Sequence, residues 1–358
     1  MTVSDLSNRV TMNFPVELYR PVIGYISHRP TLLSLLLASH HLKVEAERSL
    51  YYRFEHVHNV QTQVLFLNRI IGCSRVARLV YSYRFEIDWR TNFGADHVYW
   101  ELIPKALRAM VNLKILQFRT NGGAPVNGLL DGCTFQLEHC HWHCHSDEPQ
   151  VQTFLRTQKS LRSLSLGGWD DTRFPAPSDQ NEQPEFREVA GSYGVIHAFL
   201  PGRDITHVRW VPDLDDPWDI STGLDVVGLS PSFQKLKFLK LGGYFMRPHL
   251  CSISEHLTSL VFLELMGYDK MEDASVFALP SIKVLRISIR WGLNKIAIED
   301  PQARAEEIFA GSKSLQYIEI EEESTYRDHN KIQQYSRWGR DVGMVNRYTT
   351  DEIWPSLG

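Results

Sequence analysis

Apolar positions near the start of the chain follow the spacing of a helix. Leu18, Val22 and Ile26 recur every fourth residue and would form one apolar stripe. Pro15 stands before them, where a proline suits the first helical turn because its missing N–H needs no partner there. Pro21 falls inside the same segment, so the pattern predicts a first helix that is kinked or divided.

Two further helices are predicted before residue 55. The segment 32–37 is apolar on nearly every side, and Thr31 in front of it is a suitable N-cap. The next segment carries Leu42, Ala46 and Leu50 at spacing four, with charged residues between them. Three short helices with this much apolar surface cannot bury it among themselves, so part of it is expected to meet a partner or the rest of the chain.

From residue 76 onward, the pattern apolar-x-x-apolar-x-apolar returns nine times. It starts at Val76, Leu113, Leu137, Leu161, Ile205, Leu236, Leu260, Ile282 and Leu315. The interval from Leu161 to Ile205 is 44 residues, and the others are 22 to 37 residues. Several fall in the range of about 20–29 residues that leucine-rich repeats have, and the longer ones would hold insertions. Linking segments such as 95–110, 148–158 and 302–310 show helical apolar spacing.

The predicted fold class is α/β, with a parallel sheet on the concave face of an irregular leucine-rich-repeat solenoid. The solenoid would cover 56–323 after a three-helix module at 12–55, and an aromatic segment at 324–358 would pack over its last repeat. The polar segments 170–192 and 211–222 are expected to be loops. A doubly wound α/β domain is the alternative, but it needs a glycine-rich phosphate turn or a catalytic constellation that the sequence lacks.

Composition and charge narrow the class of protein. The formal net charge of −4 argues against a general nucleic-acid binder, which needs a basic surface to displace counterions. The five cysteines are too sparse for a secreted disulfide framework, and the first residues contain no apolar run typical of a signal peptide. The longest apolar stretch, 32–38, is too short to span a membrane. A cytoplasmic or nuclear protein with no membrane and no nucleic-acid partner is therefore expected.

The first helical module resembles an F-box, most closely that of many fungal F-box proteins. The similarity rests on order and spacing, and its residues are Phe14-Pro15-x-Glu17-Leu18, Ile23, Ile26, the leucines of 32–37, Ala38-Ser39 and Glu45-x-x-x-Ser49-Leu50-Tyr51. Phe14 stands where the family usually has a leucine, and Pro21 stands where the first helix of the family usually continues.

The resemblance implies a docking site for the Skp-type adaptor of a cullin–RING ubiquitin ligase, and it implies no cofactor. The positions by which the family contacts the adaptor correspond in this sequence to Phe14, Pro15, Leu18, Ile23, Ile26, Leu33 and Leu36. The alternative for this module is that it caps the hydrophobic end of the solenoid, as terminal repeats do.

Residues 139–145 read His-Cys-His-Trp-His-Cys-His and are the sharpest local feature of the sequence. Zinc is one interpretation, but Cys140 and Cys144 lack a second ligand pair at zinc-site spacing. In a strand, Cys140 and Trp142 would point into the core, while the histidines would alternate onto the concave face. A polar recognition surface is therefore favoured over a metal site.

The same alternation predicts a substrate-binding surface along the concave face. Its residues are Arg119, His139, His141, His143, His207, Arg209, Lys240, Glu264, Arg286 and Glu319. Along the chain, the early and middle repeats supply arginine, lysine and histidine, and the last repeat supplies glutamate. This order favours a partner with acidic character near the middle of the face.

Common catalytic motifs are absent from the sequence. It contains no GxSxG, HExxH, P-loop or paired CxxC motif. Together with the F-box resemblance, this predicts a non-enzymatic adaptor that recognises an unknown protein substrate for a Skp–cullin–F-box type ubiquitin ligase. The alternative is a protein-binding scaffold of the leucine-rich-repeat type that acts without a ligase.

Overall fold

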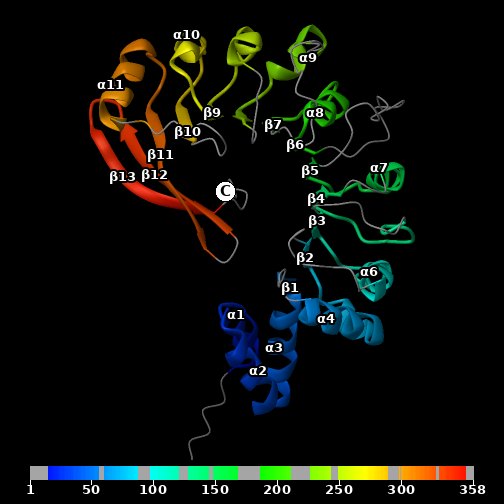
Figure 1. Cartoon of the computed structure of the whole chain (residues 1–358). Helices are drawn as coiled ribbons and strands as arrows, with labels where there is room; N and C mark the ends of the chain where they lie inside the picture. Colours follow the sequence, from blue (N-terminus) through cyan, green and yellow to red (C-terminus); the bar gives the residue numbers. More distant parts are fainter. Residues whose placement is uncertain are drawn as a thin grey trace, which may run out of the picture.

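A single sheet of thirteen strands, each lying next to its neighbours in sequence, runs through the described part of the chain. The computed structural model describes residues 15–55, 60–87, 97–120, 128–144, 148–167, 186–210, 226–242, 249–288, 298, 300–327 and 330–351. In Figure 1 the sheet curves into an arc, with the strands on the inner, concave side and the helices on the outer side.

The strands pair in parallel from β1 to β11, and β12 and β13 then continue the sheet in antiparallel fashion. They are β1 Arg53–Phe54, β2 Ser82–Ile87, β3 Ile115–Thr120, β4 His139–His143, β5 Ser163–Gly167, β6 Glu188–Gly191, β7 His207–Trp210, β8 Phe238–Leu241, β9 Phe262–Met266, β10 Val284–Ser288, β11 Tyr317–Arg327, β12 Asn330–Gly339 and β13 Gly343–Asp351. A doubly wound domain reverses its strand order at one point, and this sheet does not, so that alternative is wrong.

Helices precede the sheet and link most of its strands. They are α1 Val16–Gly24, α2 Arg29–Ala38, α3 His40–Tyr52, α4 Val60–Gly72, α5 Ser74–Ala77, α6 His97–Ala109, α7 Glu148–Arg156, α8 Tyr193–Phe199, α9 Val226–Phe233, α10 Asp273–Phe277 and α11 Pro301–Gly311, with 3-10 turns at Leu250–Ser252, Ser254–His256 and Lys270–Glu272. The helices expected at 95–110, 148–158 and 302–310 correspond to α6, α7 and α11. Within the described residues, no helix has the length and apolar character needed to cross a bilayer.

Eight of the nine predicted repeats contain a strand, which begins two residues after the first apolar position of the pattern. The first repeat was placed wrongly, because Val76 lies in α5 and the true strand β2 follows it. The sequence pattern also missed β6, since Gly191 occupies the position where the third apolar residue was sought. This strand divides the 44-residue interval between Leu161 and Ile205.

Side chains on each strand alternate between the helix side of the sheet and its concave side. On the helix side, one in-register row consists of Leu116, Cys140, Leu164, Val189, Val208, Leu239, Leu263, Leu285 and Ile318, each 0% exposed. A second row begins with Phe85, Phe118 and Trp142, whose rings stack at centroid distances of 4.8 and 4.4 Å. One continuous hydrophobic core therefore lies between the sheet and the outer helices, from Phe54 to Ile320.

Helices α1, α2 and α3 surround a small core of their own, made of Ile23, Leu32 and Ala46. Helix α1 runs through Pro21 without a break, so the expected division of this helix is wrong. Helix α2 begins at Arg29, two residues before the N-cap expected at Thr31.

The C-terminal strands extend the sheet, and the expected boundary at residue 324 falls within β11. Arg340, in the turn after β12, donates hydrogen bonds to the carbonyl oxygens of Leu315 (2.9 Å), Phe309 (3.0 Å) and Ser312. The bonds to Phe309 and Ser312 satisfy carbonyl groups at the end of α11, and the three bonds together fix the β12–β13 hairpin against that helix and the segment after it. The loop expected at 211–222 and residues 170–185 of the one expected at 170–192 lie outside the described residues. The end of the second loop prediction is wrong, because residues 188–191 form β6.

Candidate functional site

The three N-terminal helices lie at one end of the arc (Figure 1). Several of their apolar side chains are exposed. Of the seven adaptor contacts predicted from the sequence, Pro15, Leu18 and Leu33 are exposed, Ile26 and Leu36 are half-buried, Ile23 is buried, and Phe14 lies outside the described residues. Ile23 belongs to the small core of the module, so its role is to hold the helices together rather than to offer surface.

The outward stripe of α1 consists of Leu18 and Val22, four residues apart, and it continues to Tyr25 directly after the helix. On α2, Leu33 and Leu37 are four residues apart and likewise exposed. Tyr25 and Leu37 are each 90% exposed, and the sequence prediction did not include either of them. A helix that is apolar all round gives no signal for which of its leucines faces solvent.

On the concave side of the sheet, one residue from each strand contributes to an in-register row across the arc. From β2 to β12 this central row consists of Arg84, Gln117, His141, Ser165, Ala190, Arg209, Lys240, Glu264, Arg286, Glu319 and Arg337. Six of the ten substrate-binding residues predicted from the sequence lie in it, from His141 to Glu319. The other four, Arg119, His139, His143 and His207, lie in the rows on either side of it.

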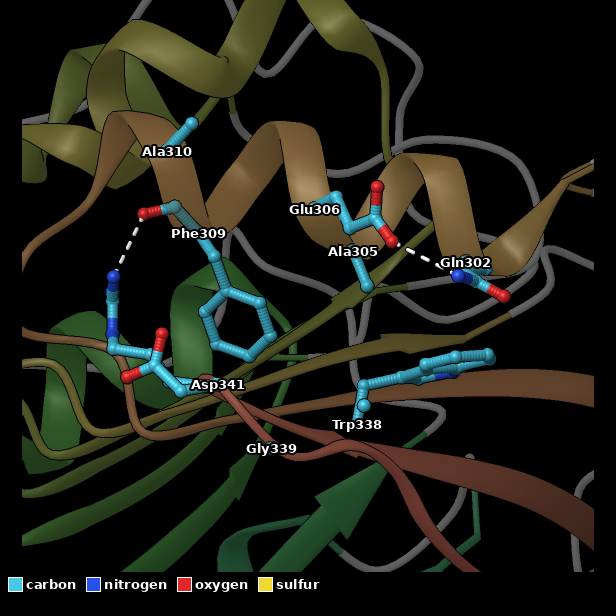
Figure 2. Close-up of a pocket in the computed structure, with 10 residues that line it drawn as sticks. Gln302, Ala305, Glu306, Phe309, Ala310, Trp338, Gly339 and Asp341 are labelled. Atoms are coloured by element: carbon cyan, nitrogen blue, oxygen red, sulfur yellow. Dashed lines mark hydrogen bonds between the residues drawn. The ribbon is translucent and has the colours of Figure 1, made fainter.

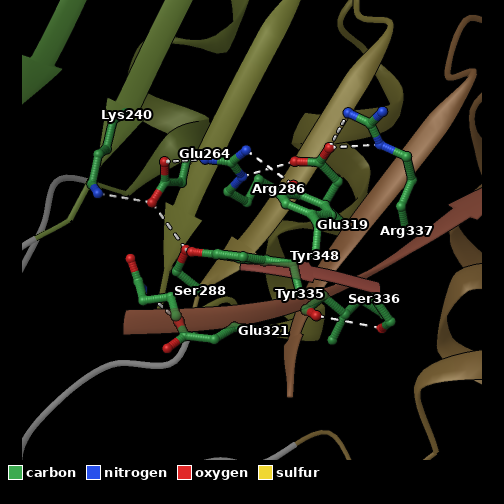
Figure 3. A network of polar contacts seen from close by, with 12 residues as sticks. Lys240, Glu264, Arg286, Ser288, Glu319, Glu321, Tyr335, Ser336, Arg337 and Tyr348 are labelled. Atoms are coloured by element: carbon green, nitrogen blue, oxygen red, sulfur yellow. Dashed lines mark hydrogen bonds and ion pairs between the residues drawn. The ribbon is translucent and has the colours of Figure 1, made fainter. Parts of the chain in front are cut away.

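The C-terminal end of the central row is a ladder of alternating charges, shown in Figure 3. Lys240 Nζ lies 2.8 Å from the Glu264 carboxylate, whose other oxygen lies 3.6 Å from Arg286. Arg286 Nε donates to Glu319 at 2.8 Å, and the same carboxylate accepts a hydrogen bond from Arg337 Nε at 2.8 Å. Each charge in this ladder therefore has an opposite charge on the neighbouring strand.

Aromatic and hydroxyl groups cover this ladder. The Arg286 guanidinium lies 5.1 Å from the Phe262 ring centroid and 4.8 Å from that of Tyr335, and it donates to Tyr348 Oη at 3.1 Å. Ser288 Oγ donates to Glu264 at 2.9 Å and lies 2.8 Å from Tyr335 Oη. The strands β12 and β13, which carry the two tyrosines, thus close the C-terminal part of the concave face.

Charge pairing and burial have opposite effects on Glu264. Burial alone would raise the pKa of its carboxyl group, but the charges of Lys240 and Arg286 lower that pKa to about 2. The carboxylate is therefore ionised at neutral pH. Lys240, Glu264 and Glu319 are buried and Arg286 is nearly so, and these four predicted binding residues engage one another in the structure.

The N-terminal half of the concave face is more accessible. His139, His141 and His143 are each partly exposed, while Cys140 and Trp142 between them are buried on the helix side, as the alternation predicted. Arg119 has 60% of its side chain exposed. On β7, His207 and Arg209 are also partly exposed.

Small residues on β5 and β6 let longer side chains converge over the middle of this half. His143 Nε2 lies 3.0 Å from Ser165 Oγ, and the His143 ring covers Gly167 so closely that a Cβ there would collide with it. Burial lowers the pKa of His141 well below its ordinary value, and the neighbouring His143 and Arg209 lower it further. Histidines from β4 and the arginine from β7 therefore act on one another across the two intervening strands.

The described residues contain no group of three histidine, cysteine or acidic side chains placed to hold a metal ion; His145 is not among them. Burial raises the pKa of the Cys140 thiol to about 12, so it is a core residue rather than a thiolate ligand.

A separate pocket of about 450 Å³ lies between α11 and the β12–β13 hairpin (Figure 2). Phe309 and Trp338 are its large apolar lining residues, and Gln302 and Asp341 lie at opposite ends of it. Gln302 Nε2 donates to Glu306 at 3.0 Å, so these two polar groups are paired with each other. The pocket lies on the helix side of the sheet, away from the charged rows of the concave face.

A scan against models of protein families found no match, and a search of curated proteins found no similar sequence.

Proposed function

We propose that this chain is the substrate-recognition subunit of a Skp–cullin–F-box type ubiquitin ligase. Helices α1 to α3 bind the Skp-type adaptor and, through it, the cullin, while the concave face of a leucine-rich-repeat solenoid holds a protein substrate. In this proposal the chain performs no bond chemistry. It acts by proximity, because holding a substrate lysine near the charged ubiquitin-conjugating enzyme raises the effective concentration of the two reactants.

The observation that carries this proposal is the exposed apolar surface on α1 and α2. It lies in the segment that resembles an F-box, and Leu18 and Leu33 are predicted contacts that are nearly half exposed. Apolar side chains this exposed on two adjacent helices are typical of a protein-binding surface. A module that only capped the main core would bury these residues against it, whereas its own core and the main core are separate clusters.

Co-purification with a Skp-type adaptor tests the docking half of the proposal. We expect the full chain to form a stable complex, and Leu18→Asp and Leu37→Asp each to weaken it by at least about tenfold, because a charge placed in an apolar interface loses its hydration without gaining a partner. Leu65→Asp is the matched control, since Leu65 on α4 is 71% exposed and lies outside the module.

The outcome of this experiment separates the two candidate functions. A complex that survives both module variants, or no complex with the wild-type chain, would leave the ligase-independent scaffold as the better explanation. Ile23→Ala is unsuitable as a test, because Ile23 is in the small core and its truncation would disturb the fold of the module itself.

A further inference from the structure

We infer that a groove at the edge of the sheet where β10 and β11 begin binds a segment of another protein in which an apolar side chain is flanked by carboxylates. The groove has a volume of about 620 Å³ and lies beside the turn between β12 and β13. Neither the helical module nor the central row of the concave face lines it. This inference therefore goes beyond the proposed function and does not rest on it.

The apolar part of the groove consists of three side chains that meet around Gly339. Atoms of Tyr317, Val342 and Val345 lie 3.1 to 3.8 Å from the position that a Cβ on this glycine would take. Tyr317 is 38% exposed, Val342 is 74% exposed and Val345 is 49% exposed. The described part of the chain thus leaves a cluster of apolar side chains uncovered, which is typical of a protein-binding surface.

Every charged residue among the described residues that line the groove is a cation. Lys313 is exposed and Lys283 is half-buried, and neither has an ion-pair partner in the part of the chain that the structure describes. Arg340 donates its hydrogen bonds to three backbone carbonyl groups, so no carboxylate balances its charge either. Three cations beside an apolar surface complement a ligand that combines carboxylates with an apolar group.

The register of the sheet continues this combination beyond the groove. The residues directly before β8 to β11 form a row linked by backbone hydrogen bonds, which Arg340 extends after β12, and the first four are Lys237, Val261, Lys283 and Gln316. Val261 is 39% exposed and stands between two lysines. Neighbouring strands lie about 4.8 Å apart, so about six extended residues of a partner would follow the row from β8 to β12.

An acidic protein segment fits this groove better than a membrane or a nucleic acid does. Apolar side chains that bind a membrane must reach about 5–10 Å into the lipid, whereas Tyr317 and Val345 line a groove. Single-stranded nucleic acids stack their bases on aromatic rings. Tyr317 is the one aromatic residue among the described lining residues, and the Arg337 guanidinium already lies over its ring at 5.2 Å from the centroid.

Fluorescence anisotropy with the full chain tests this inference. The probe is a fluorescein-labelled octapeptide with the sequence Asp-Asp-Glu-Leu-Phe-Glu-Asp-Asp. Of two matched peptides, one has Ser-Ser in place of Leu-Phe, and the other has the corresponding amide in place of each acidic residue. We expect the probe to bind, each matched peptide to bind at least about tenfold more weakly, and the affinity of the probe to fall as salt rises.

Variants of the groove test its charged and apolar parts separately. Lys313→Glu should weaken binding of the probe by about tenfold, because it replaces an attraction with a repulsion, and Val342→Asp should do the same by placing a carboxylate beside those of the ligand. Both side chains are exposed, so neither change disturbs the core. Lys105→Glu and Val98→Asp at exposed positions of α6 are the matched controls and should leave binding unchanged.

Each result decides the inference. Binding of the probe that the groove variants weaken and the controls do not change supports it. The inference is overturned if the probe does not bind, if either matched peptide binds equally well, or if the groove variants change nothing. Tighter binding of phosphatidylserine vesicles or of single-stranded oligothymidine than of the probe also overturns it. Thermal denaturation checks that each variant is folded, and where one groove variant is not, the other decides.

Discussion

Glu264 shows how one residue depends on its two neighbours in the sheet. It lies between Lys240 on β8 and Arg286 on β10, with Ser288 donating a further hydrogen bond. A buried carboxylate without such partners would take up a proton or destabilise the fold. The three contacts instead keep the group ionised and make it the centre of the ladder.

Replacing this carboxylate should expose its role directly. We expect Glu264→Gln to lower the free energy of unfolding by about 3 kcal/mol, because it leaves two buried cations without their shared partner. Chemical denaturation measures the change. Glu101→Gln on the exposed side of α6 is the control and should alter stability by no more than about 0.5 kcal/mol.

The same residue predicts a response to acid. Because the pKa of Glu264 is lower in the folded chain than its ordinary value of 4.5, its contribution to stability is present above that value. The contribution is lost as the pH falls from 4.5 toward about 2, where the folded carboxyl takes up its proton. Glu264→Gln should therefore flatten the decline in stability over this range, and an unchanged acid profile would contradict the assignment.

At the scale of the elements, β6 explains why one repeat escaped detection. The backbone of β6 pairs with β5 and β7 as an ordinary strand of the sheet does. Its last core-facing position, however, is Gly191 and not an apolar side chain. A Cβ at this glycine would lie 2.7 Å from the carbonyl oxygen of Leu166 and 2.7 Å from Val195 Cβ. The close approach of β5 and α8, rather than hydrophobicity, determines the residue here.

Gly191→Ala tests this close approach. We expect a loss of about 2 kcal/mol in the free energy of unfolding, since the carbonyl group of the neighbouring strand cannot move without breaking the sheet. Gly72→Ala, at the end of α4, has no atom within 4 Å of the added Cβ and should be neutral or slightly stabilising. Equal effects of the two substitutions in thermal denaturation would show that crowding at Gly191 is unimportant.

At the scale of the whole molecule, the helical module and the sheet are joined by a small set of contacts. Glu47 on α3 is buried and accepts two hydrogen bonds from Arg75 on α5, at 2.7 and 2.8 Å. The rings of Tyr52 on α3 and Tyr81, just before β2, stack at a centroid distance of 4.8 Å. Since the proposed mechanism depends on a fixed distance between adaptor and substrate, this junction determines how rigidly the two surfaces are related.

Loss of the Arg75 contact should loosen the junction. We expect Arg75→Ala to increase hydrogen exchange in α1 to α3 while leaving the central strands unchanged, because the two regions have separate cores. Arg78→Ala, a change at a nearby exposed arginine, should leave both regions unaffected. Faster exchange throughout the sheet would instead show that module and sheet unfold as one unit.

The sequence by itself determined the α/β class, eight of the strands and the alternation at His139 to His143, because a side chain facing the core must be apolar whatever its neighbours are. Tertiary structure alone decided which side chains meet across strands. Glu264 and Arg286 look like solvated residues in the sequence, yet register places them in contact and the tyrosines of β12 and β13 bury them. It likewise decided that Leu32 faces inward and Leu37 outward, since packing selects one face of a helix that is apolar all round.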